Sequence, residues 1–157
     1  MCGISGSGKS TIAKDLAKRY DGSIVSTDRI REELFGDANV QRQNGRVFEL
    51  AFERLKEGLE TNHCVIFDAT NLTKKDRTKV LEVAKNAGHK GFNRVCWVNS
   101  TSEDAVARNR RRERKVPTEV IERQFSKFEE PTNEECWKII DYFESVEKYF
   151  EIQKVYS

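Results

Sequence analysis

The first residues of the sequence carry its strongest chemical signal. Residues 3–11, Gly-Ile-Ser-Gly-Ser-Gly-Lys-Ser-Thr, match the phosphate-loop pattern of a glycine, four residues and then Gly-Lys-Ser/Thr. The glycines let backbone N–H groups converge on a phosphate, and the helix that follows adds its positive N-terminal end. The pattern predicts a site for a nucleoside triphosphate, with a purely structural glycine loop as the alternative.

The side chains of this loop have separate expected roles. Lys9 can reach the β and γ phosphates of a nucleotide, and the hydroxyl of Ser10 can hold Mg²⁺. The loop residues expected to contact the nucleotide are Gly3, Ser5, Gly6, Ser7, Gly8, Lys9, Ser10 and Thr11.

A carboxylate and an arginine follow the next expected strand. The β-branched run at 22–28 predicts a strand that ends near Asp28, which would then face the phosphate loop. Transfer of a phosphate to a hydroxyl needs a group that accepts the hydroxyl proton, and Asp28 can do this. A compatible alternative is that Asp28 caps the helix that follows. Arg31 would lie one helical turn later and hold an anionic acceptor, or pair with Asp28 or Glu33.

A second polar cluster ends the run at 63–71, which begins apolar and predicts a buried strand that leads into a loop. Asp68 could hold a water bound to Mg²⁺, and Thr70 and Asn71 could bind the acceptor or the phosphates. An ordinary turn and helix cap is the alternative interpretation.

A dense basic block occupies residues 107–115. Guanidinium groups stabilise the charge of a transferred phosphoryl group, and a mobile helix can bring one in as a lid. The alternative is a solvated helix face. The arginines of this block are Arg108, Arg110, Arg111, Arg112 and Arg114.

Helices and strands are expected to alternate along the chain. The expected helices span 10–20, 29–37, 46–62, 74–89, 101–115 and 117–130, and the expected strands span 22–28, 63–71 and 93–100, with another strand and a docked terminal segment within 136–157. This alternation predicts a parallel sheet covered on both faces. Only Met1 and Cys2 precede the loop, so the first strand is short or the protein starts upstream of Met1.

Length and composition favour one soluble domain spanning 1–157. Charged residues make up 34% and hydrophobic residues 37%, with no apolar run long enough for a membrane span and no secretory signal. We therefore expect a cytoplasmic protein with no membrane partner. The net charge of +2 creates no global attraction for nucleic acid. The cysteines are expected to be reduced; they are Cys2, Cys64, Cys96 and Cys136. The histidines, His63 and His89, lack the spacing of metal ligands.

From Gly3 to about Thr132 the chain resembles the 5′-hydroxyl polynucleotide kinase family of phage and bacteria. The segments GISGSGKST, STDRIR, DATN and RNRRRERKVP carry this resemblance, in that order. It implies an α/β fold of the P-loop NTPase type, a three-layer sandwich with a central parallel sheet and an arginine-bearing helical lid. The implied activity is transfer of the γ-phosphate of ATP, with Mg²⁺, to the 5′-hydroxyl end of RNA or DNA in a bacterial or phage-infected cytoplasm.

Wider relatives share this layout, including zeta-toxin-like sugar-nucleotide kinases and small-molecule kinases. A kinase of a small hydroxylated acceptor therefore stays open, as does an ATP-binding module without catalysis.

The resemblance also implies residue roles. Lys9 and Ser10 match the residues that bind ATP and Mg²⁺, Asp28 matches the general base, and Arg31 matches the arginine that holds the acceptor's phosphate. The lid arginine over the β and γ phosphates is Arg112 when counted from "RN" and Arg111 when counted back from "VP". The residues implied to be catalytic are Lys9, Asp28 and Arg112; Arg108 and Arg111 are implied to bind the nucleotide, and Arg31, Asp68, Thr70 and Asn71 to bind the acceptor.

Overall fold

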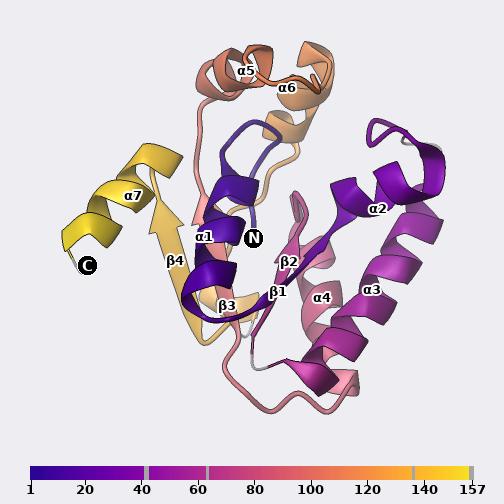
Figure 1. The fold of residues 1–157 in the computed structure, drawn as a ribbon. Coiled ribbons are helices and arrows are strands. Elements are labelled where there is room, and N and C mark those ends of the chain that lie inside the picture. The colour runs from indigo at the N-terminus through magenta and orange to yellow at the C-terminus, as the bar shows by residue number, and fades with distance from the viewer. Residues whose placement is uncertain (41–42, 63, 136, 156–157) are drawn as a thin grey trace.

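Strands and helices alternate as expected in the computed structural model, which describes residues 1–40, 43–62, 64–135 and 137–155 (Figure 1). The elements are α1 (Lys9–Arg19), β1 (Ser23–Ser26), α2 (Thr27–Phe35), α3 (Asn44–Thr61), β2 (Val65–Asp68), α4 (Lys74–Asn86), β3 (Arg94–Val98), α5 (Ser102–Arg110), α6 (Thr118–Ser126), the 3₁₀ helix η1 (Asn133–Glu135), β4 (Ile139–Phe143) and α7 (Val146–Val155). His63 and Cys136 lie outside the described residues, and Cys2, Cys64 and Cys96 are free thiols.

All the paired strands are parallel. β1 pairs with β2, which places Ser26 beside Asp68, and β3 pairs with β4. Residues 1–3 lie between these two pairs, because the N–H of Cys2 donates to the Cys96 carbonyl (2.9 Å) and the N–H of Gly3 donates to the Thr70 carbonyl (3.0 Å). A very short central segment thus leads into the phosphate loop, and the predicted parallel α/β fold is confirmed.

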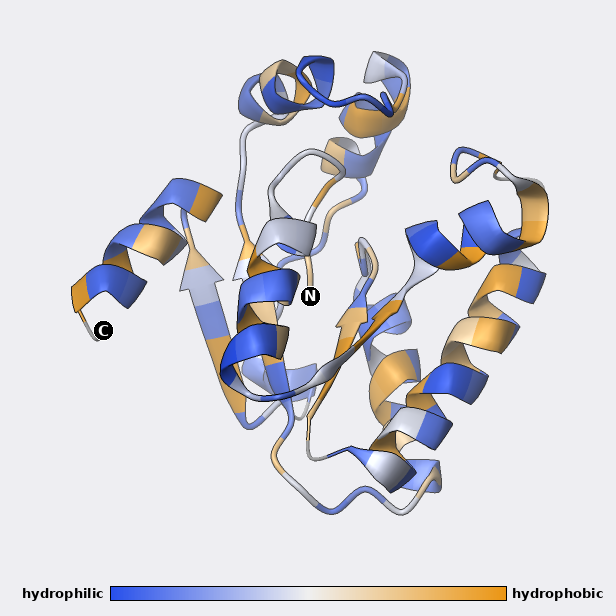
Figure 2. Ribbon diagram, viewed as in Figure 1, coloured by the Kyte–Doolittle hydropathy of each residue, from blue (hydrophilic) through white to orange (hydrophobic). Residues whose placement is uncertain are grey.

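Helices cover both faces of these strands. Figure 1 shows α1 and α7 on one side and α3 and α4 on the other. Helix α3 buries Val47, Ala51 and Leu55, which recur every four residues and form one apolar stripe (Figure 2). This stripe packs against Val25 and Phe67 of the strands. No helix in the described ranges combines the length and apolar character that crossing a membrane requires.

Helix α5 is shorter than the sequence predicts. The expected helix runs over 101–115, whereas α5 ends at Arg110. The side-chain amide of Asn109 donates to the Val116 carbonyl (2.7 Å), and its oxygen accepts from the Val116 N–H (2.9 Å). These two bonds replace further helical turns and close a loop, so the second half of the basic block is not helical.

Helix α6 also ends early, at Ser126 rather than near residue 130. The N–H of Glu129 donates to the Leu72 carbonyl (2.9 Å), which draws the chain away from the helical path and onto the loop after β2.

Helices α5 and α6 lie above the phosphate loop (Figure 1). Ile4 of the loop packs with Ala105 of α5 and Ile121 of α6 in a small buried cluster. The N–H of Ser5 donates to the side-chain oxygen of Gln124 in α6 (2.7 Å). The lid helices are therefore anchored directly on the loop that they cover.

Candidate active site

The phosphate loop forms a tight backbone cradle at the start of α1. Gly8 caps α1 with a φ of 100°, a left-handed conformation that suits glycine. A Cβ atom at Gly8 would lie 2.5 Å from the Cβ of Val146, and one at Gly6 would collide with the Ala105 carbonyl oxygen. The glycines are thus required by close approach of α5 and α7 as well as by backbone conformation.

Lys9 lies buried inside this cradle. Its ammonium donates to the Ile4 carbonyl (2.7 Å), which uses one of its three donors. Burial lowers the pKa of Lys9, and the negative charges of Asp68 and Asp28 offset part of this effect. The buried hydroxyl of Ser7 has no hydrogen-bond partner among the described residues. A buried cation with spare donors and an unpartnered hydroxyl fit a phosphate group.

Asp28 lies in the first turn of α2. The residue that caps this helix is Ser26, whose hydroxyl accepts from the N–H of Arg29 (3.5 Å), so the interpretation of Asp28 as the cap is wrong. The exposed Asp28 carboxylate instead accepts from two guanidinium groups, those of Arg31 (3.1 Å) and Arg114 (2.9 Å). One carboxylate therefore lies between an arginine of α2 and an arginine of the lid loop, the segment 111–117 between α5 and α6.

Arg31 is buried beneath this carboxylate. Its guanidinium also donates to the side-chain oxygen of Asn44 (2.9 Å), while its buried Nε has no partner among the described residues. Burial lowers the pKa of Arg31; the charge of Asp28 opposes this effect and that of Arg114 adds to it. A buried cation beside a second cation is suited to an anionic ligand.

Sequence reasoning gave Arg114 no specific role in the site. Besides Asp28, its guanidinium contacts the Asn39 side-chain oxygen (3.3 Å) and the Ala38 carbonyl (3.2 Å), which joins the lid loop to the segment after α2. The basic block at 107–115 indicated that an arginine of this region enters the site. The sequence did not show which of its five arginines does so, because this depends on the end of α5 at Arg110.

Asp28 and Arg114 line a cleft of about 330 Å³. Ser10 and Thr11 of α1 also line it, as do Asp68, which is the last residue of β2, and Arg112 of the lid loop. The strand ends thus bring the phosphate loop, the candidate base and two lid arginines around one space. Among the described residues, no group of three or more His, Cys, Asp or Glu side chains is placed to hold a metal ion.

Besides Arg31 and most of the phosphate loop, four expected site residues do not line this cleft. The Arg108 guanidinium pairs with Glu147 (3.0 Å), and Arg111 is exposed where α5 ends. The side-chain amide of Asn71 donates to the Met1 carbonyl (2.7 Å), and the carbonyl of Thr70 accepts from Gly3. The contacts of Asn71 and Thr70 support the base of the phosphate loop, and binding roles for all four residues stay predictions.

The sequence is similar to those of known proteins over most of its length. A family model described as an AAA domain matches residues 1–131, and the chain belongs to this family. A curated relative, L-seryl-tRNA(Sec) kinase of Methanococcus maripaludis, is 28% identical over 148 residues, covering 90% of this chain. The chain spans 56% of that relative's length.

Solved structures of three kinases show the same fold. They are a gluconokinase from Sinorhizobium meliloti 1021 (TM-score 0.66, 19% identity, 98% of this chain and 85% of that one), a shikimate kinase from Bacteroides thetaiotaomicron (0.60, 17%, 98% and 90%) and a deoxyadenosine kinase from M. mycoides (0.57, 16%, 98% and 95%). The P-loop fold is confirmed. The comparisons do not single out the polynucleotide kinase family that the sequence resembles.

Proposed function

We propose that this protein is an ATP-dependent kinase that phosphorylates a hydroxyl group of a small anionic acceptor. The observation that carries the proposal is Asp28, held between Arg31 and Arg114 at the cleft that begins at the phosphate loop. Phosphoryl transfer needs a positioned donor, a proton acceptor and cations around the transferred group. The chain supplies residues for each of these tasks.

The donor side is assigned to the phosphate loop. Lys9 and the converging N–H groups of the loop would hold the phosphates of ATP, and Ser10 would hold Mg²⁺. Mg²⁺, when bound, neutralises charge that develops on the phosphates. Arg112 lines the same cleft and would add a positive charge on the lid side.

The acceptor side is assigned to Asp28 and its two arginines. Both carboxylate oxygens of Asp28 are occupied by guanidinium groups. An anionic acceptor would compete for Arg31 and Arg114 and would leave Asp28 free to accept the proton of the acceptor's hydroxyl. The hydroxyl oxygen then forms the new bond to the γ-phosphorus as the bond to ADP breaks, and the proton passes to Asp28.

The size of the cleft and the similar structures support a small acceptor. A volume of about 330 Å³ is near the lower end of the usual range for small-molecule sites. The names of two similar structures, gluconokinase and shikimate kinase, point to hydroxylated carboxylic acids as acceptors of those proteins.

A hydroxyl carried by a nucleic acid is the second candidate. The similarity to an L-seryl-tRNA(Sec) kinase over 148 residues favours it, and so do the segments that resemble polynucleotide kinases. Phosphates of the nucleic acid would then occupy the place of the acceptor's anionic group beside Arg31 and Arg114.

The test measures transfer of labelled γ-phosphate from ATP with Mg²⁺ to a panel of acceptors. The panel contains gluconate, shikimate, the uncharged nucleoside deoxyadenosine, seryl-tRNA and a short 5′-hydroxyl oligonucleotide. The proposal expects labelling of a small anion and none of deoxyadenosine. Labelling of nucleic acid alone would establish the second candidate, and labelling of nothing in the panel or of deoxyadenosine alone would contradict the proposal.

The same assay with Asp28→Asn tests the proton acceptor. We expect the turnover rate to fall by about 10²–10⁴-fold, because the amide cannot accept the proton, while the dissociation constant for ATP changes little. Glu53→Gln, on an exposed position of α3, is the matched control and should keep full activity. Equal rates for the two variants would exclude Asp28 as the base.

A further inference from the structure

The peptide unit between Ile4 and Ser5 is held at both of its polar groups. Its carbonyl, that of Ile4, accepts hydrogen bonds from the ammonium of Lys9 (2.7 Å) and from the N–H of Ser7 (3.2 Å). Its N–H, that of Ser5, donates to the side-chain oxygen of Gln124 in α6 (2.7 Å). The carbonyl and the N–H of a trans peptide point in opposite directions, so this unit lies between Lys9 and Gln124.

The carbonyl of this peptide anchors the Lys9 ammonium. In the described part of the chain it is the single hydrogen-bond partner of that ammonium, which keeps two further donors for phosphate oxygens. A lysine ammonium sits at the end of a flexible stem, so its position depends on what holds it. The place of the Ile4 carbonyl therefore decides where the two free donors lie.

The backbone around this peptide does not fix it by itself. Gly3 (φ 141°) and Gly6 (φ 87°) flank the peptide, and glycine lacks the steric restriction that fixes the backbone of other residues. The lid helices supply the constraint, because the Ile4 side chain packs with Ile121 of α6 and the peptide N–H is bonded to Gln124. Of these two contacts, the one with Gln124 acts directly on the polar groups of the peptide.

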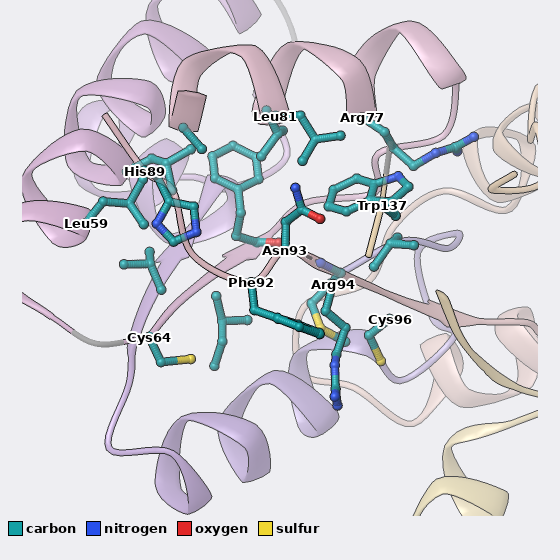
Figure 3. A pocket seen from close by; sticks show the side chains of 18 of the residues that line it. Leu59, Cys64, Arg77, Leu81, His89, Phe92, Asn93, Arg94, Cys96 and Trp137 are labelled. Atoms are coloured by element: carbon teal, nitrogen blue, oxygen red, sulfur yellow. Dashed lines mark hydrogen bonds between the residues drawn. The ribbon is translucent and has the colours of Figure 1, made fainter. Parts of the chain in front are cut away.

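The chain before the loop is packed more loosely than the loop itself. Met1 borders a mostly apolar cavity of about 470 Å³ between β2 and β3, and Figure 3 shows Arg77 at its edge. No residue of the phosphate loop and none of α6 lines this cavity. Its empty space contributes no van der Waals contacts to the chain before the loop. The peptide that anchors Lys9 is therefore supported from the lid side.

We propose that Gln124 is a positioning residue of the donor side, which sets the place of the Lys9 ammonium through the Ile4–Ser5 peptide. The inference rests on the proposed function, since that function assigns Lys9 to the phosphates of ATP. Gln124 does not line the cleft, so its contribution is made through the loop. The side chain that ties α6 to the loop thereby also prepares the site for ATP.

The test is a double-mutant cycle on the affinity for ATP with Mg²⁺, measured by calorimetry. Gln124→Met keeps the length of the side chain and removes its acceptor oxygen, and we expect the dissociation constant to rise about 5-fold. In a Lys9→Met protein the same substitution should change the dissociation constant by less than about 2-fold, because no ammonium is left to be positioned. An equal rise in both backgrounds, or no rise in the unsubstituted one, would overturn the proposal.

Amide hydrogen exchange at Ser5 checks the bond itself in the protein without ATP. Gln124→Met should speed this exchange, and Gln124→Glu, which keeps an acceptor oxygen, should preserve the slow rate. Unchanged exchange in Gln124→Met, or equally fast exchange in Gln124→Glu, would overturn the proposal. Arg123→Met, at the preceding exposed position of α6, is the matched control and should change neither the exchange nor the affinity for ATP.

Failure of the proposed function gives a different pattern of results. A protein that binds ATP but transfers phosphate to no acceptor would contradict the kinase function, while the cycle and the Ser5 exchange would still decide the role of Gln124. A protein that transfers phosphate and keeps its affinity for ATP in Gln124→Met would contradict the role of Gln124 alone. A protein that does not bind ATP would contradict both.

Discussion

The donor side and the acceptor side of the cleft are built in opposite ways. The donor side consists of nine consecutive residues, 3–11, whose backbone and buried Lys9 form the cradle. The acceptor side consists of side chains brought together from distant segments, since Asp28 and Arg114 are 86 residues apart. The Asp28 side chain is 51% exposed and that of Arg114 36% exposed, whereas Lys9 is 7% exposed.

This difference predicts how each side responds to change. A buried backbone cradle tolerates few substitutions, because a new Cβ has no space and a lost cation leaves the phosphates unpaired. The Arg114 side chain, which is partly exposed on a loop, can be exchanged at lower cost to the fold. We therefore expect substitutions on the donor side to lower the rate for every acceptor and substitutions of Arg114 to alter the selectivity among acceptors.

Besides Asp28→Asn, the largest expected effect on the rate is that of Lys9→Ala. Removal of the buried ammonium should lower the rate of phosphate transfer by about 10²–10³-fold for every acceptor, because the loss concerns the shared donor. Initial rates with two different acceptors measure this. Lys18→Ala, at an exposed position in the last turn of α1, is the control and should retain the rate. A loss confined to one acceptor would contradict the division between the two sides.

A buried ion pair between α4 and η1 should contribute strongly to stability. Arg77 donates to both carboxylate oxygens of Glu135 (2.6 and 2.7 Å), and both side chains are at most 1% exposed. Arg77 also donates to the carbonyls of Asn71 and Glu129, so it joins the loop after β2 to the chain after α6. Arg77→Met should lower the free energy of unfolding by about 3–5 kcal/mol, because Glu135 becomes a buried unpaired charge.

Chemical denaturation measures this loss, and a double variant separates charge from packing. Arg77→Met with Glu135→Leu should recover part of the lost free energy, since no unpaired charge is left. A double variant that is less stable than the single one would show that the hydrogen bonds which Glu135 accepts from Thr132 and Trp137 outweigh its unpaired charge.

Arg114→Ala tests the role assigned to the acceptor side. We expect KM for an anionic acceptor to rise about 10-fold and KM for ATP to change little, because the guanidinium contacts Asp28 and not the phosphate loop. Arg110→Ala, exposed at the end of α5, is the matched control. An equal rise in KM for ATP would assign Arg114 to the donor side.

The smallest expected effect is that of Arg54→Ala. Arg54 of α3 makes a bidentate pair with Glu33 of α2, with both side chains more than a third exposed. Exposed pairs contribute little, so the free energy of unfolding should change by no more than about 1 kcal/mol and activity should be unchanged. A marked loss of activity would mean that the α2–α3 contact positions Asp28, and that the acceptor side depends on more than its own side chains.

Most of the fold could be predicted from the sequence, and the failures have local causes. The helix starts at residues 9–10 and 101–102 follow from the phosphate-loop and Thr-cap patterns, and Gly36 ends α2 in a left-handed conformation as glycine allows. The early end of α5 depends on Asn109 bonding to Val116 seven residues away. The helical pattern of the basic block contains no sign of that contact.

The candidate site also contains features that the sequence predicts and features that it does not. By itself the sequence determined the phosphate loop, the alternation of strands and helices, and the Asp28–Arg31 spacing, because these depend on residues that are neighbours along the chain. Only the tertiary structure decided that Arg114 reaches Asp28, that Asn71 supports Met1, and that residues 1–3 lie between two strand pairs. Those contacts join segments separated by 66 residues or more, and their geometry comes from the packing of helices and strands rather than from any local pattern.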